Sequence, residues 1–158
     1  MKRLFLLFFP LLLLSCNSSA QDSKKAKIYP VSKSETEWKA ALSPADFQVL
    51  RKKGTERAYS SKLNRVDQPG TFVCAACGNE LYRTGNKFES GTGWPSFDRP
   101  IDEANVDYKP DGYAALEVLC ANCGGHLGHR FNDGPRNTTG KRHCINGVAL
   151  DFIPADAE

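Results

Sequence analysis

The 158-residue sequence predicts a mainly β fold of the α+β class, in which short N-terminal helices precede antiparallel sheet. Helical patterns are confined to residues 34–54, whereas glycine and proline recur after Gly54 and the apolar runs there are short. In addition, two Cys-x-x-Cys pairs each end a strand-like segment, as in proteins where a metal ion joins two knuckles. These features fit one domain with a single core.

Two helices are expected before Gly54. "SETEWKAAL" (34–42) is a short candidate, and "SPADFQVLRKKG" (43–54) is a stronger one. In the second segment Ser43 suits the N-cap, Pro44 the first helical position and Asp46 the first turn. Gly54 marks its end.

The rest of the chain predicts short strands separated by turns. Strands are expected in "TFVCAAC" (71–77), "ELYR" (80–83), "AALEVLC" (114–120) and "INGVALDFI" (145–153). Turns are expected in "DQPG" (67–70), "GTGWPS" (91–96), "KPDG" (109–112), "NDGP" (132–135) and "NTTG" (137–140).

The N-terminus, "MKRLFLLFFPLLLLSC" (1–16), has the pattern of a secretory signal. Lys2 and Arg3 precede an apolar run of 11 residues, Leu4 to Leu14, which is too short for a bilayer span of about 20 residues. "LLSC" (13–16) resembles the lipobox of bacterial lipoproteins, in which residues 1–15 are removed and Cys16 carries the lipid. An ordinary signal peptide or a short anchor helix would show the same apolar run. We expect a lipid-anchored protein of the bacterial cell envelope, at the outer membrane or periplasmic face rather than the inner membrane.

Residues 16–33 are polar, small and basic, and predict a flexible tether ahead of a domain spanning residues 34–158. Loss of residues 1–15 removes two of the 21 basic residues and none of the 18 acidic ones, so the net charge falls from +3 to +1. Such a balance provides no electrostatic footprint for nucleic acid.

The two Cys-x-x-Cys pairs predict a structural zinc site. Cys74 with Cys77 and Cys120 with Cys123 form two knuckles, and a glycine follows each second cysteine. Four thiolates complete a closed tetrahedral site, although 42 residues separate the knuckles, more than in the usual pattern. Two disulfides are the alternative in an oxidising compartment, but Cys-x-x-Cys disulfides are typical of redox-active pairs rather than structural ones.

Cys144 is then a free thiol in "GKRHCINGVALDF" (140–152). A free cysteine is often a small buried hydrophobic residue. If this segment is extended, however, Arg142, Cys144 and Asn146 point to the same side, and the charge of Arg142 would lower the pKa of the thiol. His126 and His129 follow the second knuckle and could be further metal ligands, but a thiol with histidines also suggests a nucleophile with a proton donor.

Several stretches together resemble the peptide-methionine (R)-S-oxide reductases, the MsrB family. They are "GTE" (54–56), "TFVCAACG" (71–78), "KFESGTGWPSF" (87–97), "LEVLCANCGGHLGHRFNDGP" (116–135) and "RHCINGVALDF" (142–152). The resemblance implies two antiparallel sheets and one zinc ion held by the four cysteines. It also implies reduction of methionine-R-sulfoxide in oxidised proteins. We further expect recycling by a thioredoxin-like thiol, and a monomer.

The resemblance also implies roles for individual residues. Cys144 matches the nucleophile, and His126 and His129 match the groups that protonate the sulfoxide oxygen. Trp94, which composition alone would assign to packing, matches the aromatic that contacts the substrate methyl group. Residues that shape the polar side of the site are matched by Arg142, Asn146 and Asp133.

Two positions depart from the family pattern. Thr92 stands where many members have the cysteine that resolves the sulfenic acid, and "DGYAALEV" (111–118) lacks a common arginine. The first departure predicts recycling by an external thiol. The alternative function is a membrane-tethered zinc-knuckle binding module, in which Cys144 would be buried and inert.

Overall fold

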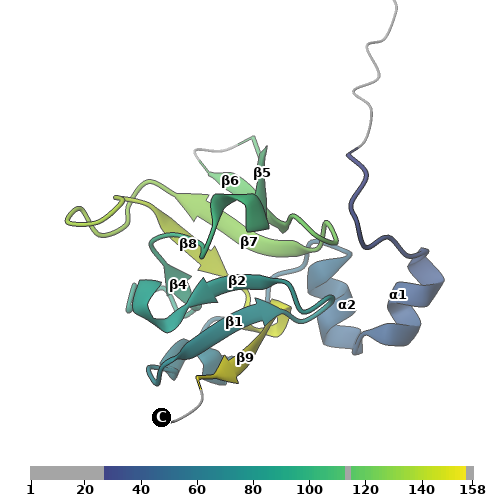
Figure 1. Ribbon diagram of the computed structural model, residues 1–158, viewed down its shortest axis with the longest axis horizontal. Helices are drawn as coiled ribbons and strands as arrows, with labels where there is room; N and C mark the ends of the chain where they lie inside the picture. Colours follow the sequence, from purple (N-terminus) through teal and green to yellow (C-terminus); the bar gives the residue numbers. More distant parts are fainter. Residues whose placement is uncertain (1–26, 113–114, 156–158) are drawn as a thin grey trace, which may run out of the picture.

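The computed structural model describes residues 27–112 and 115–155. Within them the chain forms two antiparallel sheets (Figure 1). The smaller sheet has the order β2-β1-β9, from β1 (Gly70–Cys74), β2 (Glu80–Arg83) and β9 (Leu150–Pro154). The larger has the order β3-β4-β8-β7-β6-β5, from β3 (Lys87–Phe88), β4 (Ser96–Phe97), β5 (Val106–Pro110), β6 (Leu116–Cys120), β7 (His126–Phe131) and β8 (Arg142–Ile145). The mainly β class and its two antiparallel sheets are confirmed.

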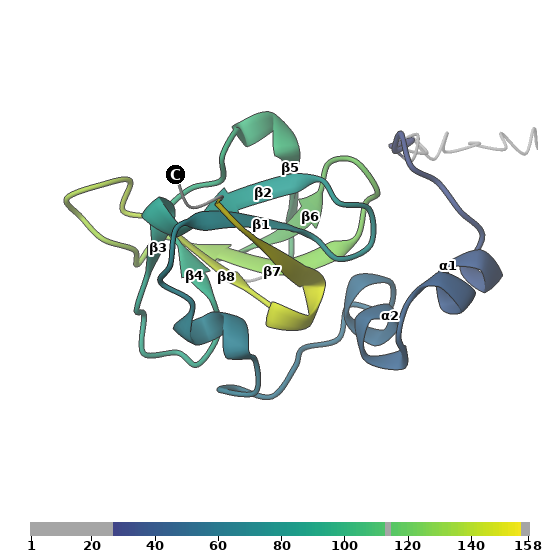
Figure 2. The same ribbon diagram turned by 60° about the horizontal axis from the view of Figure 1, so that its bottom comes forward.

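Two short helices lie at one end of the sheets (Figures 1 and 2). Helix α1 (Glu35–Ala41) begins at Ser34, whose side chain forms a capping box with Glu37. Helix α2 (Pro44–Leu50) begins at Ser43, whose hydroxyl accepts from the N–H of Asp46 as the sequence predicted. Short 3₁₀ turns occupy Lys62–Arg65, Thr84–Asn86, Glu103–Asn105 and Gly147–Ala149.

Aromatic side chains join the two sheets into one core. Phe72 of β1 packs edge-on against Phe97 of β4, with ring centroids 5.0 Å apart. Tyr82 of β2 stacks on the same Phe97 at 4.3 Å. All three side chains are fully buried, and burial of each ring stabilises the fold by roughly 2–3 kcal/mol. The sheet that carries Cys144 is thereby held against the sheet that carries the first knuckle.

Residues 145–153, predicted as one strand, contain a crossing between the sheets instead. Strand β8 ends at Ile145 in the larger sheet, and β9 begins at Leu150 in the smaller one. The 3₁₀ turn Gly147–Ala149 lies between them, and Figure 2 shows it in yellow at the junction of β8 and β9. The prediction of a continuous strand is wrong because an apolar run does not reveal which sheet each half joins.

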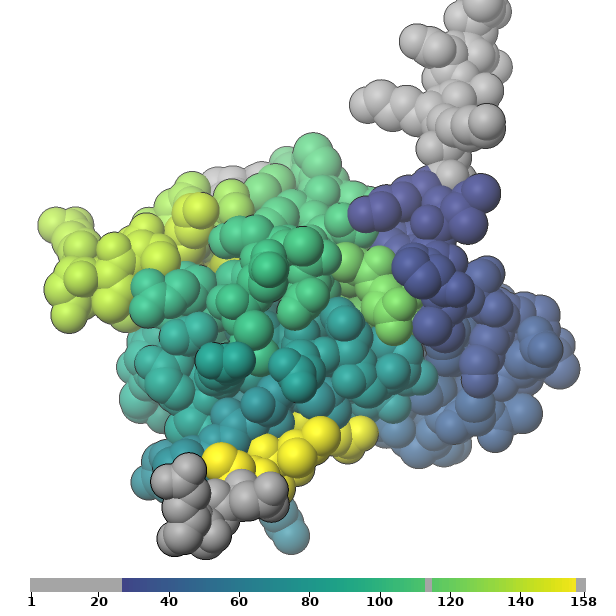
Figure 3. Space-filling view, viewed as in Figure 1, coloured from purple at the N-terminus to yellow at the C-terminus, as the bar shows by residue number. Residues whose placement is uncertain are grey.

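Part of the predicted tether lies on the folded body. The N–H of Val31 donates to the carbonyl of Asn122 in the second knuckle at 2.9 Å, and Lys27 pairs with Asp107 at 2.6 Å. The space-filling view shows this purple segment directly against the rest of the molecule (Figure 3). The predicted signal peptide and Cys16 lie outside the described residues. No helix in the described part of the chain is long and apolar enough to cross a membrane.

Candidate active site and metal centre

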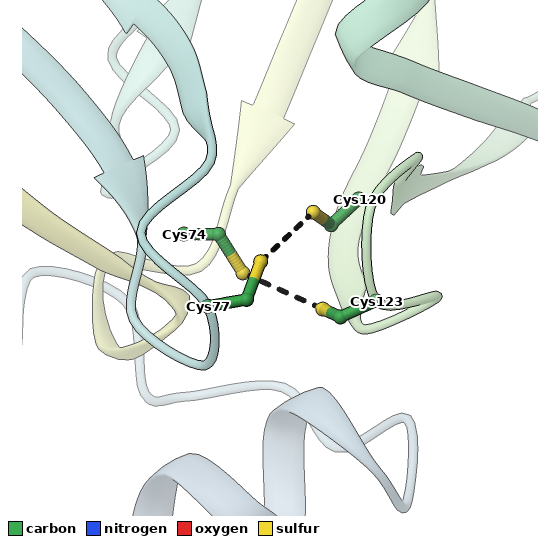
Figure 4. A group of neighbouring side chains, drawn as sticks. All are labelled: Cys74, Cys77, Cys120 and Cys123. Atoms are coloured by element: carbon green, nitrogen blue, oxygen red, sulfur yellow. Dashed lines mark hydrogen bonds between the residues drawn. The ribbon is translucent and has the colours of Figure 1, made fainter. Parts of the chain in front are cut away.

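The four knuckle cysteines converge from two turns. Cys74 ends β1 and Cys77 lies in the turn after it, while Cys120 ends β6 and Cys123 lies in the turn after that strand (Figure 4). Their sulfur atoms all lie within 4.8 Å of one another. The knuckles therefore meet in space despite the long stretch of chain between them.

The spacing of the sulfurs fits a tetrahedral metal site. Cys77 and Cys120 are 3.6 Å apart at sulfur, and Cys74 and Cys123 are 3.8 Å apart. A tetrahedral ion with metal–sulfur bonds of about 2.3 Å requires sulfurs about 3.8 Å apart, whereas a disulfide bond is about 2.05 Å long. All four are free thiols, so the disulfide alternative does not describe this structure.

Amide groups support the sulfurs. The side chain of Asn122 donates to the sulfur of Cys77 at 3.5 Å, and that of Asn79 donates to the sulfur of Cys120 at 3.7 Å. Such donors favour the thiolate form that binds a metal ion. The four-cysteine cluster is thus a candidate structural metal centre.

Cys144 lies in the middle of the larger sheet. Strand β8 runs between β4 and β7, with Cys144 opposite Ser96 on one side and His129 on the other. Alternation along β8 sends His143 and Ile145 into the core, where both are fully buried. Arg142 and Cys144 face the opposite side, as the sequence predicted.

A cavity of about 180 Å³ opens over the Cys144 thiol. Its walls are Thr55, Trp94, Gly128, His129, Phe131, Cys144 and Asn146. The predicted nucleophile, one of the two histidines, the indole and Asn146 therefore share one cavity. Arg142, Asp133 and His126 are close to it but are not among its wall residues.

Burial raises the pKa of the Cys144 thiol, while hydrogen bonding to Thr92 and the charge of Arg142 oppose the rise. Arg142 acts in the expected direction, but the expected net lowering is wrong because desolvation of the thiolate outweighs the favourable contacts. The thiol is held largely neutral in the free protein. Formation of the Cys144 thiolate therefore depends on the groups that surround the sulfur.

The two histidines have different environments. His129, on the cavity wall, has its Nε2 atom 2.7 Å from a carboxylate oxygen of Asp111. His126 is 3 % exposed and has its Nδ1 atom 2.9 Å from Glu117. Burial lowers the pKa of His126 despite this carboxylate. His126 is therefore neutral at pH 7, and its ring packs edge-on against that of His129 with centroids 5.4 Å apart.

Arg142 and Asp133 form a two-pronged ion pair beside the cavity. The Nε and Nη2 atoms of Arg142 each donate to an Asp133 carboxylate oxygen at 2.9 Å. The guanidinium also lies over the ring of Phe131, 4.3 Å from its centroid. Because Phe131 is a cavity wall, this pair fixes one wall and keeps a positive charge near the thiol.

Glu56 is a structural residue of the site to which the sequence assigned no role. Its carboxylate accepts from the N–H groups of Gly147 and Val148, and its carbonyl accepts from the Trp94 indole at 3.1 Å. Its own N–H donates to Asn146 Oδ1 at 3.0 Å. Asn146 is thus engaged by backbone groups, and Glu56 holds the indole and the crossing turn together. The sequence did carry one signal for Glu56, because it belongs to the "GTE" stretch (54–56) that resembles the MsrB family.

Comparisons with known proteins agree with this arrangement. The model of the SelR domain matches residues 42–154. A Leptospira interrogans protein named "Peptide methionine sulfoxide reductase MsrB" is 50% identical over 127 residues, covering 78% of this chain and 96% of its own length. A protein of the same name from Methanosarcina barkeri is 52% identical over 125 residues, covering 77% of this chain and 87% of its own.

Among solved structures, the Mis18 "Yippee-like" domain covers 57% of this chain and all of its own, with a TM-score of 0.47 and 15% identity. That likeness is too weak to carry an argument. The match of the SelR model to most of the chain, and the extent of identity to the MsrB proteins, are decisive: this chain belongs to the SelR domain family, the family of the MsrB proteins.

Proposed function

We propose that this protein reduces methionine-R-sulfoxide in oxidised proteins to methionine. The observation that carries the proposal is the single cavity in which a thiol, an imidazole and an indole meet, those of Cys144, His129 and Trp94, in a chain of the MsrB family. A methyl sulfoxide has one electrophilic sulfur, one basic oxygen and one apolar end. The cavity offers a partner for each.

The reaction transfers one oxygen atom from substrate to enzyme. The thiolate of Cys144 attacks the sulfoxide sulfur and forms a sulfur–sulfur bond; the protonated oxygen then passes to the cysteine sulfur as the sulfur–oxygen bond and the new sulfur–sulfur bond both break. The methionine sulfur gains two electrons and the cysteine sulfur loses two, so a thiol and a sulfoxide become a sulfenic acid and a thioether. The oxygen keeps the proton that His129 gives it, His129 takes up the proton that the Cys144 thiol loses, and no other oxidant or reductant enters this step.

The other residues of the site have separate roles in this reduction step. His129 donates a proton to the sulfoxide oxygen as the sulfur–oxygen bond weakens. His126, neutral and packed on His129, orients that ring. The Trp94 indole forms the apolar wall for the methyl group, and the guanidinium of Arg142, positioned by Asp133, provides positive charge where the thiolate forms.

Recycling uses an external thiol. The described residues contain one thiol outside the metal cluster, Cys144 itself, and the hydroxyl of Thr92 lies 3.8 Å from its sulfur. One thiol of an external dithiol, such as a thioredoxin-like protein, therefore attacks the sulfenic acid to give a mixed disulfide and water, and its second thiol breaks that disulfide and frees Cys144. After one turnover without reductant, Cys144 is expected to be trapped by dimedone with about one methionine formed per enzyme. A disulfide between Cys144 and a knuckle cysteine would contradict this route.

The test of function compares the two sulfoxide epimers. Purified protein with a dithiol should reduce a peptide containing methionine-R-sulfoxide and leave the S epimer unchanged. The reason is that inversion at sulfur would direct the oxygen onto the indole and the methyl group toward His129. Equal rates on both epimers would refute the assigned geometry, and turnover of neither by folded protein would refute the activity.

The metal is zinc in this proposal, held by Cys74, Cys77, Cys120 and Cys123, and its role is structural. With four sulfur ligands a zinc ion has no open position for substrate and supplies only folding free energy. Metal analysis of purified protein should give about one zinc per chain. A different metal, or none in folded protein, would contradict this assignment.

The N-terminal sequence supports a lipid anchor on Cys16, after removal of residues 1–15, with the domain in the bacterial cell envelope. Mass spectrometry of protein from membranes should find a diacylglyceryl cysteine at the new N-terminus. Cys16→Ala should abolish the lipid-bearing species and leave residues 1–15 attached. Protein cut after residue 15 with no lipid on Cys16 would contradict lipid anchoring.

A further inference from the structure

Three hydroxyl groups extend from the Cys144 sulfur into the protein. The Thr92 hydroxyl oxygen lies 3.8 Å from that sulfur and 2.8 Å from the hydroxyl of Ser90. Ser90 is in turn 2.7 Å from the hydroxyl of Ser96, and Ser96 reaches the carbonyl of Trp94 at 3.1 Å. Ser96 is only 1 % exposed, so the inner end of this hydroxyl chain is closed to water.

The number of available hydrogens requires all hydrogen bonds along this hydroxyl chain to run in the same donor-to-acceptor direction. Each hydroxyl has one hydrogen to donate. If Ser96 donates to the Trp94 carbonyl, then Ser90 donates to Ser96 and Thr92 donates to Ser90. The Thr92 oxygen is then an acceptor toward Cys144, and its partner is the S–H of the neutral thiol. This arrangement suits the resting state, in which burial disfavours the thiolate.

The hydrogen bonds that link the three hydroxyls and the Cys144 sulfur can all reverse direction. Ser96 can donate to Ser90, Ser90 to Thr92, and Thr92 to a thiolate on Cys144. The reversal gives up only the bond from Ser96 to the Trp94 carbonyl, which at 3.1 Å is longer than the two bonds between hydroxyls. A hydrogen bond to an ion is stronger than one between neutral groups, so the exchange favours the anion.

We propose that the chain Thr92–Ser90–Ser96 is a reversible hydrogen-bond relay that satisfies Cys144 both as thiol and as thiolate, with Thr92 the group that stabilises the anionic nucleophile. The proposal rests on the proposed role of Cys144. It gives position 92 a function in a chain that lacks a cysteine there.

The charged groups around Cys144 are engaged with other partners, so stabilisation of the thiolate from the β4 side falls to another group. On β8 and after β7, Arg142 faces the thiol and is paired with Asp133; on β7, His129 is paired with Asp111. In the loop before β4, the Glu89 carboxylate accepts from the N–H of Gly91. The Glu56 carboxylate is engaged by the turn at Gly147. Among the described residues, the polar contact to the Cys144 sulfur from the β4 side is the Thr92 hydroxyl.

The test measures how fast iodoacetamide alkylates Cys144 as a function of pH, because only the thiolate reacts. Thr92→Val keeps the shape and removes the hydroxyl. Its alkylation profile should move to higher pH, with a rate at pH 7 on the order of threefold to tenfold below that of the parent protein. Thr92→Ser, which keeps the hydroxyl, should restore the parent profile. Ser90→Ala should shift the profile in the same direction as Thr92→Val but by less, because Thr92 then lacks the donor behind it.

Two outcomes would each overturn the relay: a Thr92→Val profile that matches the parent, and a Thr92→Ser profile that matches Thr92→Val. If Thr92→Val fails to fold by circular dichroism, Thr92→Ala takes its place with the same criteria. Alkylation needs no sulfoxide, so the two proposals fail separately. An unshifted profile with intact sulfoxide reduction refutes only the relay, and a shifted profile without sulfoxide reduction refutes only the function.

Discussion

The two cysteine centres of this protein use the same atom in opposite ways. At the knuckles, four sulfurs lie within 4.8 Å of one another and present no open coordination position. At the cavity, one sulfur stands alone with a hydroxyl at 3.8 Å and an open space of about 180 Å³ before it. The neighbours of a cysteine therefore decide its role: a closed set of thiolates can hold a metal ion, whereas an isolated thiol at a cavity can react.

Substitution of one cysteine at each centre should have opposite effects on activity and on stability. Cys144→Ser should lower sulfoxide reduction by on the order of 10³-fold or more, because a hydroxyl is a far weaker nucleophile than a thiolate. Its unfolding midpoint should stay within a few degrees of the parent value. A steady-state assay and a thermal melt check both points, and substantial residual turnover would remove Cys144 from the mechanism.

The matched change at the other centre should give the reverse pattern. Cys120→Ser leaves three sulfur ligands, so the metal and the folding free energy that it supplies are lost together. We expect less than one metal ion per chain and a melting temperature lower by more than about 10 °C. A metal-free variant that melts with the parent protein would show that the cluster does not stabilise the fold.

A third prediction concerns the buried His143 on β8, whose side chain is fully buried with Nδ1 3.1 Å from the Tyr82 hydroxyl. Burial lowers the pKa of His143 to about 3, below the unfolded value of about 6.5. The unfolded state therefore binds the proton first, and stability present above pH 6.5 is lost as the pH falls toward 3.

Between pH 7 and pH 5 this single group should lower the free energy of unfolding by about 2 kcal/mol. Urea titrations at the two pH values measure the loss. His143→Gln is less stable but has no such proton to bind, so its stability should fall by about 2 kcal/mol less over the same interval. Equal losses in both proteins would show that another group, such as a knuckle cysteine, controls the acid response.

The next substitution places a second thiol beside Cys144, so that two sulfurs lie close together there as they do at the knuckles. Thr92→Cys places a second sulfur where an oxygen now lies 3.8 Å from the Cys144 sulfur. After one turnover without reductant, the new thiol should condense with the sulfenic acid to form a disulfide. Thiol titration should find two thiols lost per methionine formed. Persistence of a dimedone-reactive sulfenic acid would mean that the loop cannot bring the sulfurs into bonding geometry.

The smallest expected effect is at Asp111. Its carboxylate contacts His129 at 2.7 Å, but both side chains are partly exposed, 45% and 30%. Asp111→Asn removes the charge and keeps the size. An exposed pair of this kind contributes little, so kcat/KM should fall by about two- to fivefold. A loss of a hundredfold or more would make Asp111 an essential partner of His129.

The sequence predicted the parts of the fold that depend on local patterns. Ser43 and Pro44 start α2 where their chemistry placed them, and "ELYR" coincides with β2. The strands β3, β4, β5 and β7 were missed. Proline and glycine in "KPDG" mask the end of β5, and "GGHLGHRF" lacks the alternation of apolar and polar residues that marks a half-buried strand. These segments become strands because they pair with other strands of the larger sheet, and local sequence patterns do not reveal that pairing.

At the candidate site, residue types were easier to predict than their contacts. The alternation along β8 placed Arg142 and Cys144 on one side correctly. The sign of the thiol pKa shift was missed because it depends on how deeply Cys144 is buried. Asp111 could not be linked to His129 from sequence, since its contact arises only through the pairing of β5, β6 and β7.

Glu56 has a consequence for how this sequence can change over time. One residue anchors the crossing between the two sheets and also supports the indole over the cavity. A substitution there would disturb folding and substrate contact at once, so neither property can be altered at this position independently of the other. Surface positions such as Ile28, which is 86% exposed, carry no such double constraint. Variation that tunes substrate preference is therefore expected at cavity-wall residues that do not also hold the sheets together, with Thr55 and Phe131 the first places to look.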